Sequence, residues 1–260
     1  MDTIVAMSLQ SPELTWLAPG QAFPEISSSW HANSPAPGLL AAGGALDVDT
    51  LCSAYCRGIF PWFSHGQPIL WWCPDPRMVL TCSEFRLHPS FKKSLKKFRR
   101  HVEYEIRIDF AFEQVIRACA SSVRHGQSGT WILPEMITAY CALHEAGFAH
   151  SVETWMHGEL VGALYCVGLG KSVFGESMFS LRPEASKIAL AALVAFCRHH
   201  GIGQIDCQQQ TRHLASLGAR AMPRQQFLEG VSSTLTQKAP DWRFAPLYWN
   251  ELIPPEPAPA

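Results

Sequence analysis

The sequence carries little charge and no clear excess of either sign. Of its 260 residues, 17% are Asp, Glu, Lys or Arg, and the formal net charge is −1. This balance excludes a globally basic nucleic-acid-binding protein. Hydrophobic residues make up 47%, which is ample for a packed core and argues against disorder. We therefore expect one large folded domain or two modest ones.

Long apolar runs are also absent. No run reaches the roughly 18 residues that a bilayer-spanning helix needs, and the longest candidate, residues 188–197, is typical of a buried helix. No basic segment precedes the apolar residues of the N-terminus, so the sequence predicts no secretory signal. We expect a cytoplasmic protein without membrane contact.

Several motifs of known chemistry are missing. The sequence contains no GxxxxGK(S/T), GxGxxG, GxSxG or HExxH. Its nine cysteines form no CxxC and suggest reduced core thiols. A zinc site through Cys52 and Cys56 is a minor alternative, because no second ligand pair is evident. We therefore expect no metal site.

Proline and aromatic residues punctuate the first part of the chain. An irregular leader, residues 1–45, precedes a short helix over 49–58 that Asp49 or Thr50 caps. Aromatic stretches follow, and Pro74-Asp75-Pro76 then marks a boundary. We predict a small N-terminal α/β domain over residues 1–75, a second domain over 76–253 and a disordered tail over 254–260.

The second domain alternates predicted strands and helices. The strands are expected at 78–82, 104–108, 150–155, 160–167, 172–175 and 203–207, and the helices at 90–100, 112–119, 134–145, 184–199, 211–217 and 223–237. Asp109 is expected to cap the second of these helices. Mixed strands and crossover helices predict an α+β fold.

Two segments place polar side chains in apolar surroundings. If residues 202–208 form a strand, Asp206 and Gln208 would point to one face about 7 Å apart. There they could orient an amine and an ester carbonyl, or satisfy loop backbone groups. Glu176 lies among Phe174, Met178 and Phe179. A carboxylate among apolar side chains must be paired or hydrogen-bonded, or its pKa must be raised. Glu176 therefore belongs either to a functional site or to a buried contact that caps loop backbone groups.

Basic and aromatic residues suggest contact with a polyanion. Six of the nine residues at 92–100 are basic, which makes a local docking patch on an otherwise neutral protein. Nine tryptophans is a high count. Trp62 and Trp131 lie in loop-like contexts, where an indole could stack on a base for about 1–3 kcal/mol or could pack a domain seam.

Seven ordered segments resemble the leucyl/phenylalanyl-tRNA–protein transferase family. They are residues 58–63 (GIFPWF), 69–72 (ILWW) with 74–77 (PDPR), 129–132 (GTWI), 160–162 (LVG), 175–180 (GESMFS) with 185–187 (ASK), 205–208 (IDCQ) and 215–219 (ASLGA). The resemblance covers about residues 36–250. It implies a second domain like that of GNAT-type acetyltransferases and the transfer of Leu, Phe or Met from aminoacyl-tRNA to proteins that begin with Arg or Lys, which marks them for N-end-rule degradation.

The resemblance also implies site roles. The expected catalytic residues are Glu176, Asp206 and Gln208, and the expected adenosine-binding residues are Trp62 and Trp131. The aminoacyl pocket would be lined or bordered by Tyr140, Leu164, Val173, Met178, Leu193 and Ile205. The tRNA backbone would contact Lys92, Lys93, Lys96, Lys97, Arg99 and Arg100. Leu164, Val173 and Leu193 stand where Met or Phe is expected, so the pocket stays apolar while its shape differs.

An aminoacyl ester is already activated, so we expect neither a cofactor nor a metal, and a monomer that attacks directly. Asp206 would receive or relay the proton of the amine, whose pKa lies near 8, while Gln208 and Glu176 position the reactants. One alternative is an acyl-CoA-dependent N-acetyltransferase. Residues 180–183 (SLRP) lack its Gly-rich pyrophosphate turn. The other alternative is a non-catalytic tRNA-binding module.

Overall fold

The computed structural model describes residues 13–122 and 132–254, and its strands form two sheets. The first sheet has the order β1-β2-β4-β3 and the second the order β11-β5-β10-β9-β8-β7-β6. The strands are β1 (Thr15–Leu17), β2 (Leu39–Gly43), β3 (Phe60–Pro61), β4 (Leu70–Trp72), β5 (Arg77–Thr81), β6 (Tyr104–Ile108), β7 (Ala149–Met156), β8 (Glu159–Leu169), β9 (Ser172–Ser180), β10 (Gln204–Gln208) and β11 (Arg220–Met222).

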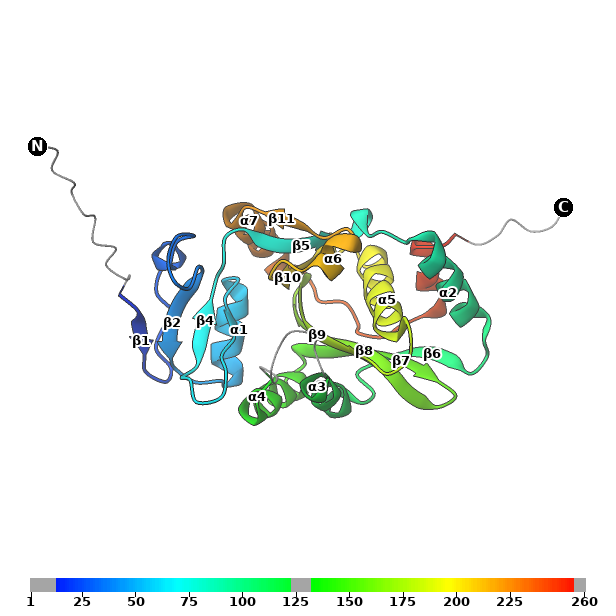
Figure 1. Ribbon diagram of the computed structural model, residues 1–260, viewed down its shortest axis with the longest axis horizontal. Helices are drawn as coiled ribbons and strands as arrows, with labels where there is room; N and C mark the ends of the chain where they lie inside the picture. The colour runs from blue at the N-terminus through cyan, green and yellow to red at the C-terminus, as the bar shows by residue number, and fades with distance from the viewer. Residues whose placement is uncertain (1–12, 123–131, 255–260) are drawn as a thin grey trace, which may run out of the picture.

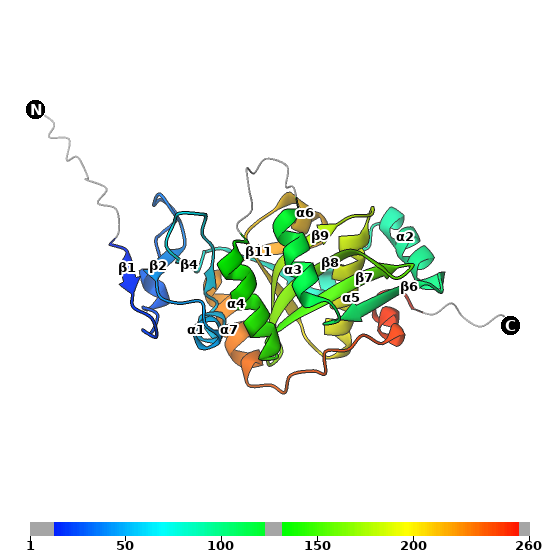
Figure 2. The same ribbon diagram turned by 90° about the horizontal axis from the view of Figure 1, so that it is seen from below.

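Helices cover both faces of the larger sheet (Figure 1). The α-helices are α1 (Val48–Cys56), α2 (Pro89–Arg100), α3 (Phe112–Ser121), α4 (Pro134–Glu145), α5 (Ala185–His199), α6 (Arg212–Ser216) and α7 (Arg224–Leu235), and the short 3-10 turns are η1 (Ile26–Ser28), η2 (Cys82–Glu84) and η3 (Pro246–Glu251). Helices α2 and α5 lie on one face, and α3 and α4 lie on the other, as both views show (Figures 1 and 2). None of the described helices combines the length and apolarity that crossing a bilayer requires.

The larger sheet is mixed. Strands β9 and β10 pair in parallel, and the other neighbouring strands of this sheet pair antiparallel. The predicted α+β class is therefore confirmed. The predicted strand at 172–175 is too short, since β9 continues to Ser180 along its antiparallel partner β8. Helix α5 buries eleven of its residues, as its apolar circumference predicts.

Two predicted helix caps are wrong. Helix α1 begins one residue earlier than expected, and Asp47 rather than Asp49 or Thr50 caps it, accepting from the Thr50 amide at 2.8 Å. Asp109 does not cap α3. Its carboxylate accepts instead from the backbone amide of Ser151 at 2.8 Å and lies 2.7 Å from His150 Nδ1. A carboxylate at a strand end satisfies the neighbouring strand when that strand offers the closer donors.

One apolar core joins the two sheets. It contains Trp71 of the small sheet and Tyr55 of α1, together with Tyr165 and Phe174 of the large sheet. A second core, under α5 and α2, lies on the other face of the large sheet. Helix α1 thus packs between the sheets and carries its tyrosine to the strands that form the site below.

Candidate active site

Strands β9 and β10 separate soon after they pair. Their parallel ladder holds two residue pairs, Ile205 with Val173 and Asp206 with Phe174, although β9 runs on to Ser180. Each strand then has an irregularity against its other neighbour: β9 opposite residues 165–166 of β8, and β10 between Asp206 and Gln208. Bulges re-aim side chains and end pairing, so the two strands open a wedge.

Glu176 lies at the bulge of β9 and is held by hydroxyl and amide donors. Its Oε1 accepts from Tyr55 Oη at 2.7 Å and from Gln208 Nε2 at 2.7 Å. Its Oε2 lies 3.3 Å from Tyr140 Oη, and the two tyrosine hydroxyls also hydrogen-bond to each other. Three elements, α1, α4 and β10, therefore converge on one carboxylate.

The Glu176 carboxyl has a strongly shifted pKa, raised to about 7. Burial is the main cause, and the nearby negative charge of Asp206 acts in the same direction. The hydrogen bonds from Tyr55, Tyr140 and Gln208 oppose the shift. At neutral pH this group therefore exists in both protonation states, which suits a residue that exchanges a proton with substrate.

Gln208 owes its position to a strained backbone. Its φ is +58°, a left-handed conformation that costs a non-glycine residue on the order of 1–3 kcal/mol. The backbone amide of Gln208 donates to Asp206 Oδ1 at 2.8 Å, which holds the turn. The side-chain amide is thereby aimed at Glu176.

Asp206 lies beneath this pair and is 1% exposed. Both of its oxygens accept from Arg77, at 2.8 Å from Nε and 2.6 Å from Nη2. Arg77 is itself fully buried, donates to the Gly58 carbonyl at 2.9 Å and stacks against Phe60 and Phe227. The carboxylate of Asp206 is therefore enclosed and already paired, and the role expected for it, receiving or relaying the proton of the amine, stays a prediction.

An apolar cavity of about 250 Å³ adjoins Glu176. Its lining includes four of the six residues predicted for the aminoacyl pocket, Leu164, Met178, Leu193 and Ile205. Tyr140 borders it through its contact with Glu176. Val173 does not line this cavity; it lines a separate one beside α7.

Several residues of the site are not predicted by the sequence patterns. They include Arg77, which stands in the PDPR segment, and Tyr55, which lies on the apolar face of a predicted helix. The cavity is also lined by Tyr165, Gly175, Ser177, Leu190, Cys207, Thr211, His213 and Leu214. Burial raises the pKa of the Cys207 thiol, so this cysteine stays protonated and is a poor nucleophile.

Of the two predicted adenosine-binding residues, one lies away from the apolar cavity and the other lies outside the residues that the structure describes. Trp62 follows β3 in the smaller sheet, half-buried, with its ring 5.5 Å from that of Trp72. It does not line the cavity. Trp131 lies outside the described residues.

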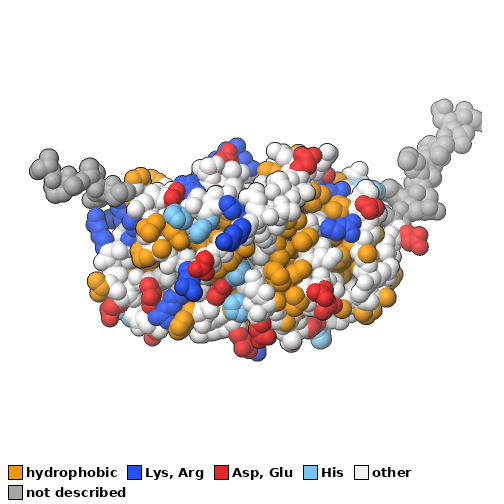
Figure 3. All heavy atoms as spheres, turned by 180° about the vertical axis from the view of Figure 1, so that it is seen from behind, with side chains coloured by type: hydrophobic (Ala, Val, Ile, Leu, Met, Phe, Trp, Pro, Cys, Tyr) orange, Lys and Arg blue, Asp and Glu red, His pale blue; other side chains and the backbone are white. Residues whose placement is uncertain are grey.

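The residues of the predicted basic patch lie on helix α2 and differ in how exposed they are. Phe91, Leu95 and Phe98 are buried, as predicted. Arg99 is committed within the fold: it donates to the Ile253 carbonyl at 3.2 Å. The exposed members are Lys92, Lys93, Lys97 and Arg100, while Lys96 is half-buried. Seen from behind, basic side chains are interspersed with acidic and hydrophobic ones and make no continuous basic face (Figure 3).

Comparison with known proteins bears on this geometry. Residues 79–232 match the family model described as leucyl/phenylalanyl-tRNA protein transferase, and residues 44–75 match the model of that family's N-terminal domain. The chain is 63% identical over 250 residues to the leucyl/phenylalanyl-tRNA–protein transferase of Albidiferax ferrireducens, covering 96% of this chain and 98% of the relative. It is 59% identical to that of a Polaromonas species (93% and 94% covered) and 55% identical to that of Leptothrix cholodnii (88% and 90% covered).

Among solved structures, the similarity is too weak to carry an argument. A Staphylococcus epidermidis protein of unknown function has a TM-score of 0.33, 10% identity and 57% coverage of both chains. The structure of L-PGS from Bacillus licheniformis has a TM-score of 0.36 and 12% identity, and the match covers 78% of this chain and 65% of that one.

Proposed function

The chain belongs to the leucyl/phenylalanyl-tRNA protein transferase family, and from that premise we propose that it transfers Leu, Phe or Met from aminoacyl-tRNA to the N-terminal Arg or Lys of acceptor proteins. The observation that carries the proposal is the junction of an apolar cavity with the Glu176–Gln208 pair. An aliphatic cavity suits an uncharged side chain, because charged ones would pay a desolvation cost there. The adjoining polar groups suit an amine and an ester.

In the proposed reaction the neutral α-amine of the acceptor attacks the ester carbonyl directly. The new amide bond forms, the ester C–O bond breaks, and the tRNA leaves as its 3′-terminal alcohol. Glu176 accepts the proton that the amine loses and passes it to the departing 3′ oxygen, since its pKa of about 7 lies close to that of an α-amine. Its Oε2 has spare acceptor capacity, because Tyr140 at 3.3 Å is its one donor among the residues that the structure describes.

Gln208 and Asp206 act in different ways in this scheme. Gln208 contacts Glu176 directly and orients it, and one amide hydrogen stays available to the ester or the acceptor. Asp206 acts as a positioning residue: its carboxylate, held by Arg77, fixes the backbone of Gln208. Glu176, rather than Asp206, takes the proton in this scheme because Glu176 borders the cavity and Asp206 is enclosed.

The size of the cavity bears on donor selection. At about 250 Å³ it is small for a ligand site, and Leu164 and Leu193 leave it aliphatic. We expect charged and polar aminoacyl groups to be rejected strongly. Leu, Met and Phe should be ranked more softly, by about 1–3 kcal/mol per methylene-sized change.

The remaining assignments follow from the family. Trp62 and Trp131 would hold the terminal adenosine, and the exposed basic residues of α2 would contact the tRNA backbone. The larger sheet, with its parallel strands that separate beside the site, is consistent with a GNAT-like domain over residues 76–253 and a smaller one over 1–75. The protein would work as a cytoplasmic monomer.

The test is donor and acceptor selectivity of the unmodified protein. We expect label to pass from Leu-tRNA or Phe-tRNA to a peptide that begins with Arg or Lys, and little label to pass to the same peptide beginning with Asp. Charged Glu-tRNA serves as the donor control. Equal transfer from Glu-tRNA, or no transfer from Leu-tRNA while the tRNA still binds, would refute the proposal.

A further inference from the structure

Two imidazoles and one carboxylate gather beside the turn that joins β7 to β8. They belong to His101, directly after α2, to Glu103, directly before β6, and to His157 in that turn. One nitrogen or oxygen atom from each lies within 4.8 Å of the other two. Among the residues that the structure describes, this is the one group of three or more His, Cys, Asp or Glu side chains placed closely enough to hold a metal ion. None of the three borders the aminoacyl cavity.

The backbone brings the ligand-bearing segments together without any ion. Strands β6 and β7 are antiparallel, and the pair nearest this turn joins Tyr104 to Met156. Beyond that pair, the His157 amide donates to the Glu103 carbonyl at 3.0 Å. The turn from β7 to β8 has only two residues, His157 and Gly158, whose φ values are 54° and 76°. Asn or Asp followed by Gly is usual in such a turn. Histidine tolerates the same backbone and adds a metal ligand.

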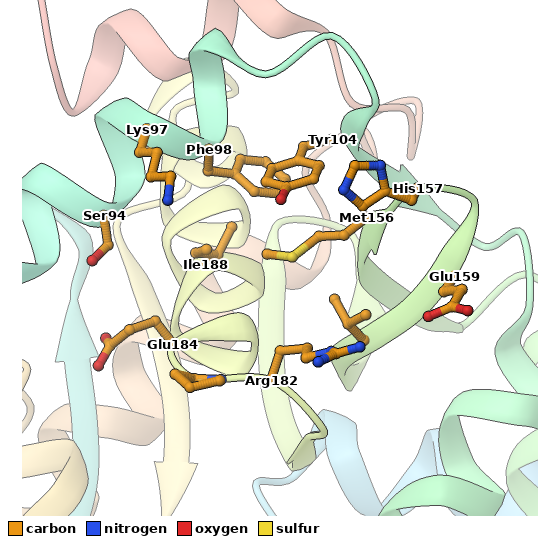
Figure 4. A pocket seen from close by; sticks show the side chains of 12 residues that line it. Ser94, Lys97, Phe98, Tyr104, Met156, His157, Glu159, Arg182, Glu184 and Ile188 are labelled. Atoms are coloured by element: carbon orange, nitrogen blue, oxygen red, sulfur yellow. The ribbon is translucent and has the colours of Figure 1, made fainter.

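Contacts within the group already orient its side chains. His157 Nδ1 lies 2.7 Å from Glu103 Oε2, so the two side chains share a proton. The His101 ring stacks on Tyr104 with centroids 3.8 Å apart, and it lies edge to face with the His157 ring at 5.1 Å. Figure 4 shows the rings of Tyr104 and His157 side by side at one end of the cleft beneath α2. The three donors therefore have less rotamer freedom to lose on binding an ion than isolated surface side chains have.

The donor set and its exposure suit a zinc-class cation. Imidazole nitrogen and carboxylate oxygen bind Zn²⁺ at about 2.0–2.2 Å, and three protein ligands leave a fourth position to water. The side chains of His157 and Glu103 are 55% and 60% exposed, so an ion can enter from solvent and keep that water. Mg²⁺ and Ca²⁺ prefer six or more oxygen ligands, which a single carboxylate does not provide.

Binding of the ion requires only small movements. The ion would take the place of the proton between His157 and Glu103, and those two ligand atoms would part from 2.7 Å to about 3.3 Å, the spacing of tetrahedral ligands around zinc. His101 Nδ1 accepts from the Glu103 backbone amide at 3.3 Å, beyond the usual range for such a bond. The His101 ring can therefore offer its lone pair to the ion at the loss of one weak contact.

We propose that His101, Glu103 and His157 form a binding site for one Zn²⁺ ion. The ion would tie the end of α2 to the turn between β7 and β8, as a structural link away from the aminoacyl cavity. Sequence patterns predict no metal site there, because Glu103 and His157 are 54 positions apart and belong to no metal-binding motif. Such a site involves neither tRNA nor an acceptor, so it stands or falls independently of the proposed function.

Isothermal titration calorimetry of the metal-free full chain with ZnCl₂ tests the proposal. Thiols such as the exposed Cys56 also bind zinc, so they are first alkylated with iodoacetamide. We expect one Zn²⁺ per chain, and binding about a hundredfold weaker in His157→Asn, which keeps a residue that suits the turn. His65→Asn is the matched control, because His65 is also exposed and also precedes a turn glycine with positive φ. Its affinity for zinc should stay within about twofold of that of the unmodified protein.

Thermal unfolding supplies a second readout. Zn²⁺ at a hundredfold excess over Kd should raise the Tm of the unmodified protein by about 5 °C, and that of Glu103→Gln or His157→Asn by about 1 °C at most. Mg²⁺ at the same concentration should leave all three Tm values unchanged. Zinc binding by His157→Asn as tight as that by His65→Asn would overturn the site, and so would loss of zinc binding by the unmodified protein on alkylation. Equal stabilisation by Mg²⁺ would overturn the assignment to zinc.

Discussion

At the scale of single residues, the site depends on a buried ion pair. Arg77 and Asp206 are 129 positions apart in the chain and almost wholly buried. Two hydrogen bonds join them; Arg77 also donates to the Gly58 carbonyl, and Asp206 also accepts from the Gln208 backbone amide. A buried pair of this kind adds little net stability, yet removing one partner leaves an uncompensated charge.

Replacing Asp206 by Asn should therefore cost stability as well as activity. We expect Asp206→Asn to lower the free energy of unfolding by about 3–5 kcal/mol, measured by urea denaturation, because the Arg77 charge stays buried without its counterion. The double variant Arg77→Met with Asp206→Leu is the control and should recover most of that loss. A single variant as stable as the unmodified protein would show that the pair is open to solvent.

The raised pKa of Glu176 makes stability depend on pH. The carboxyl titrates near 4.5 when unfolded and near 7 when folded, so the folded state binds the proton more tightly. Its contribution is fully present below about pH 4.5 and is lost as pH rises through 7. We expect the unmodified protein to lose up to about 3 kcal/mol over this range relative to Glu176→Gln. Parallel stability–pH curves for the two proteins would contradict the shift.

The chemistry of individual residues could be predicted from sequence only in part. The apolar neighbours of Glu176 predict a carboxylate with a perturbed pKa, and in the structure burial raises that pKa. The protection of Asp206 could not be predicted, because its partner Arg77 comes from a distant segment. Alternation along a strand also misleads at a bulge, where the left-handed backbone of Gln208 redirects its amide.

At the scale of secondary-structure elements, the site exists because β9 and β10 stop pairing and diverge. Gly175 lies where they still run close: a Cβ built there would stand 3.2 Å from the Asp206 carbonyl oxygen. That approach is tighter than ordinary packing and involves backbone that cannot swing away. Glycine at this position therefore lets the two strands begin their wedge next to Glu176.

Gly175→Ala should disturb activity more than folding. The added methyl should push β10 aside by a few tenths of an ångström and misalign Gln208, so we expect kcat to fall about tenfold. Overpacking of this size costs about 1–3 kcal/mol, which thermal unfolding can measure. Gly203→Ala is the matched control, since a Cβ there meets nothing within 4 Å. Equal kcat values for both variants would show that the close approach of β9 and β10 at Gly175 does not position Gln208.

The elements themselves were largely predictable. The helix over residues 134–145 begins at a proline and ends before a glycine, and α4 has those bounds. The strand at 104–108 and the buried face of α2 were also predicted, because period and punctuation are local. The caps of α1 and α3 were not: Asp47 caps α1 through a local bond to the Thr50 amide, and at α3 the distant Glu153 accepts from the Ala111 amide.

At the scale of the whole molecule, two sheets share one core. Trp71 is fully buried within the core that also holds Phe174 of the large sheet, and the Arg77 side chain reaches the Gly58 carbonyl beside β3. The order of strands in the large sheet was not predictable, because β5 inserts between β10 and β11 from far back in the chain. Such pairings depend on long-range contacts that local periodicity does not encode.

A shared core predicts that the two sheets unfold together. We expect urea transitions followed by tryptophan fluorescence and by far-ultraviolet circular dichroism to coincide. Trp71→Ala should shift both by the same amount, for a loss of about 3–5 kcal/mol. Two separated transitions, with the first alone sensitive to Trp71→Ala, would show that the small sheet is an independent unit.

The central claim is that Glu176 and Gln208, at the mouth of the apolar cavity, carry out aminoacyl transfer. The most direct measurement is the rate of Leu transfer from Leu-tRNA to an Arg-initiated peptide under saturating substrates. We predict that Glu176→Ala and Gln208→Ala each lower kcat by about 10²–10³, while Lys238→Ala, a surface change outside both cavities, leaves it unchanged. Folded variants of Glu176 and Gln208 that transfer Leu within about threefold of the unmodified rate would contradict the account.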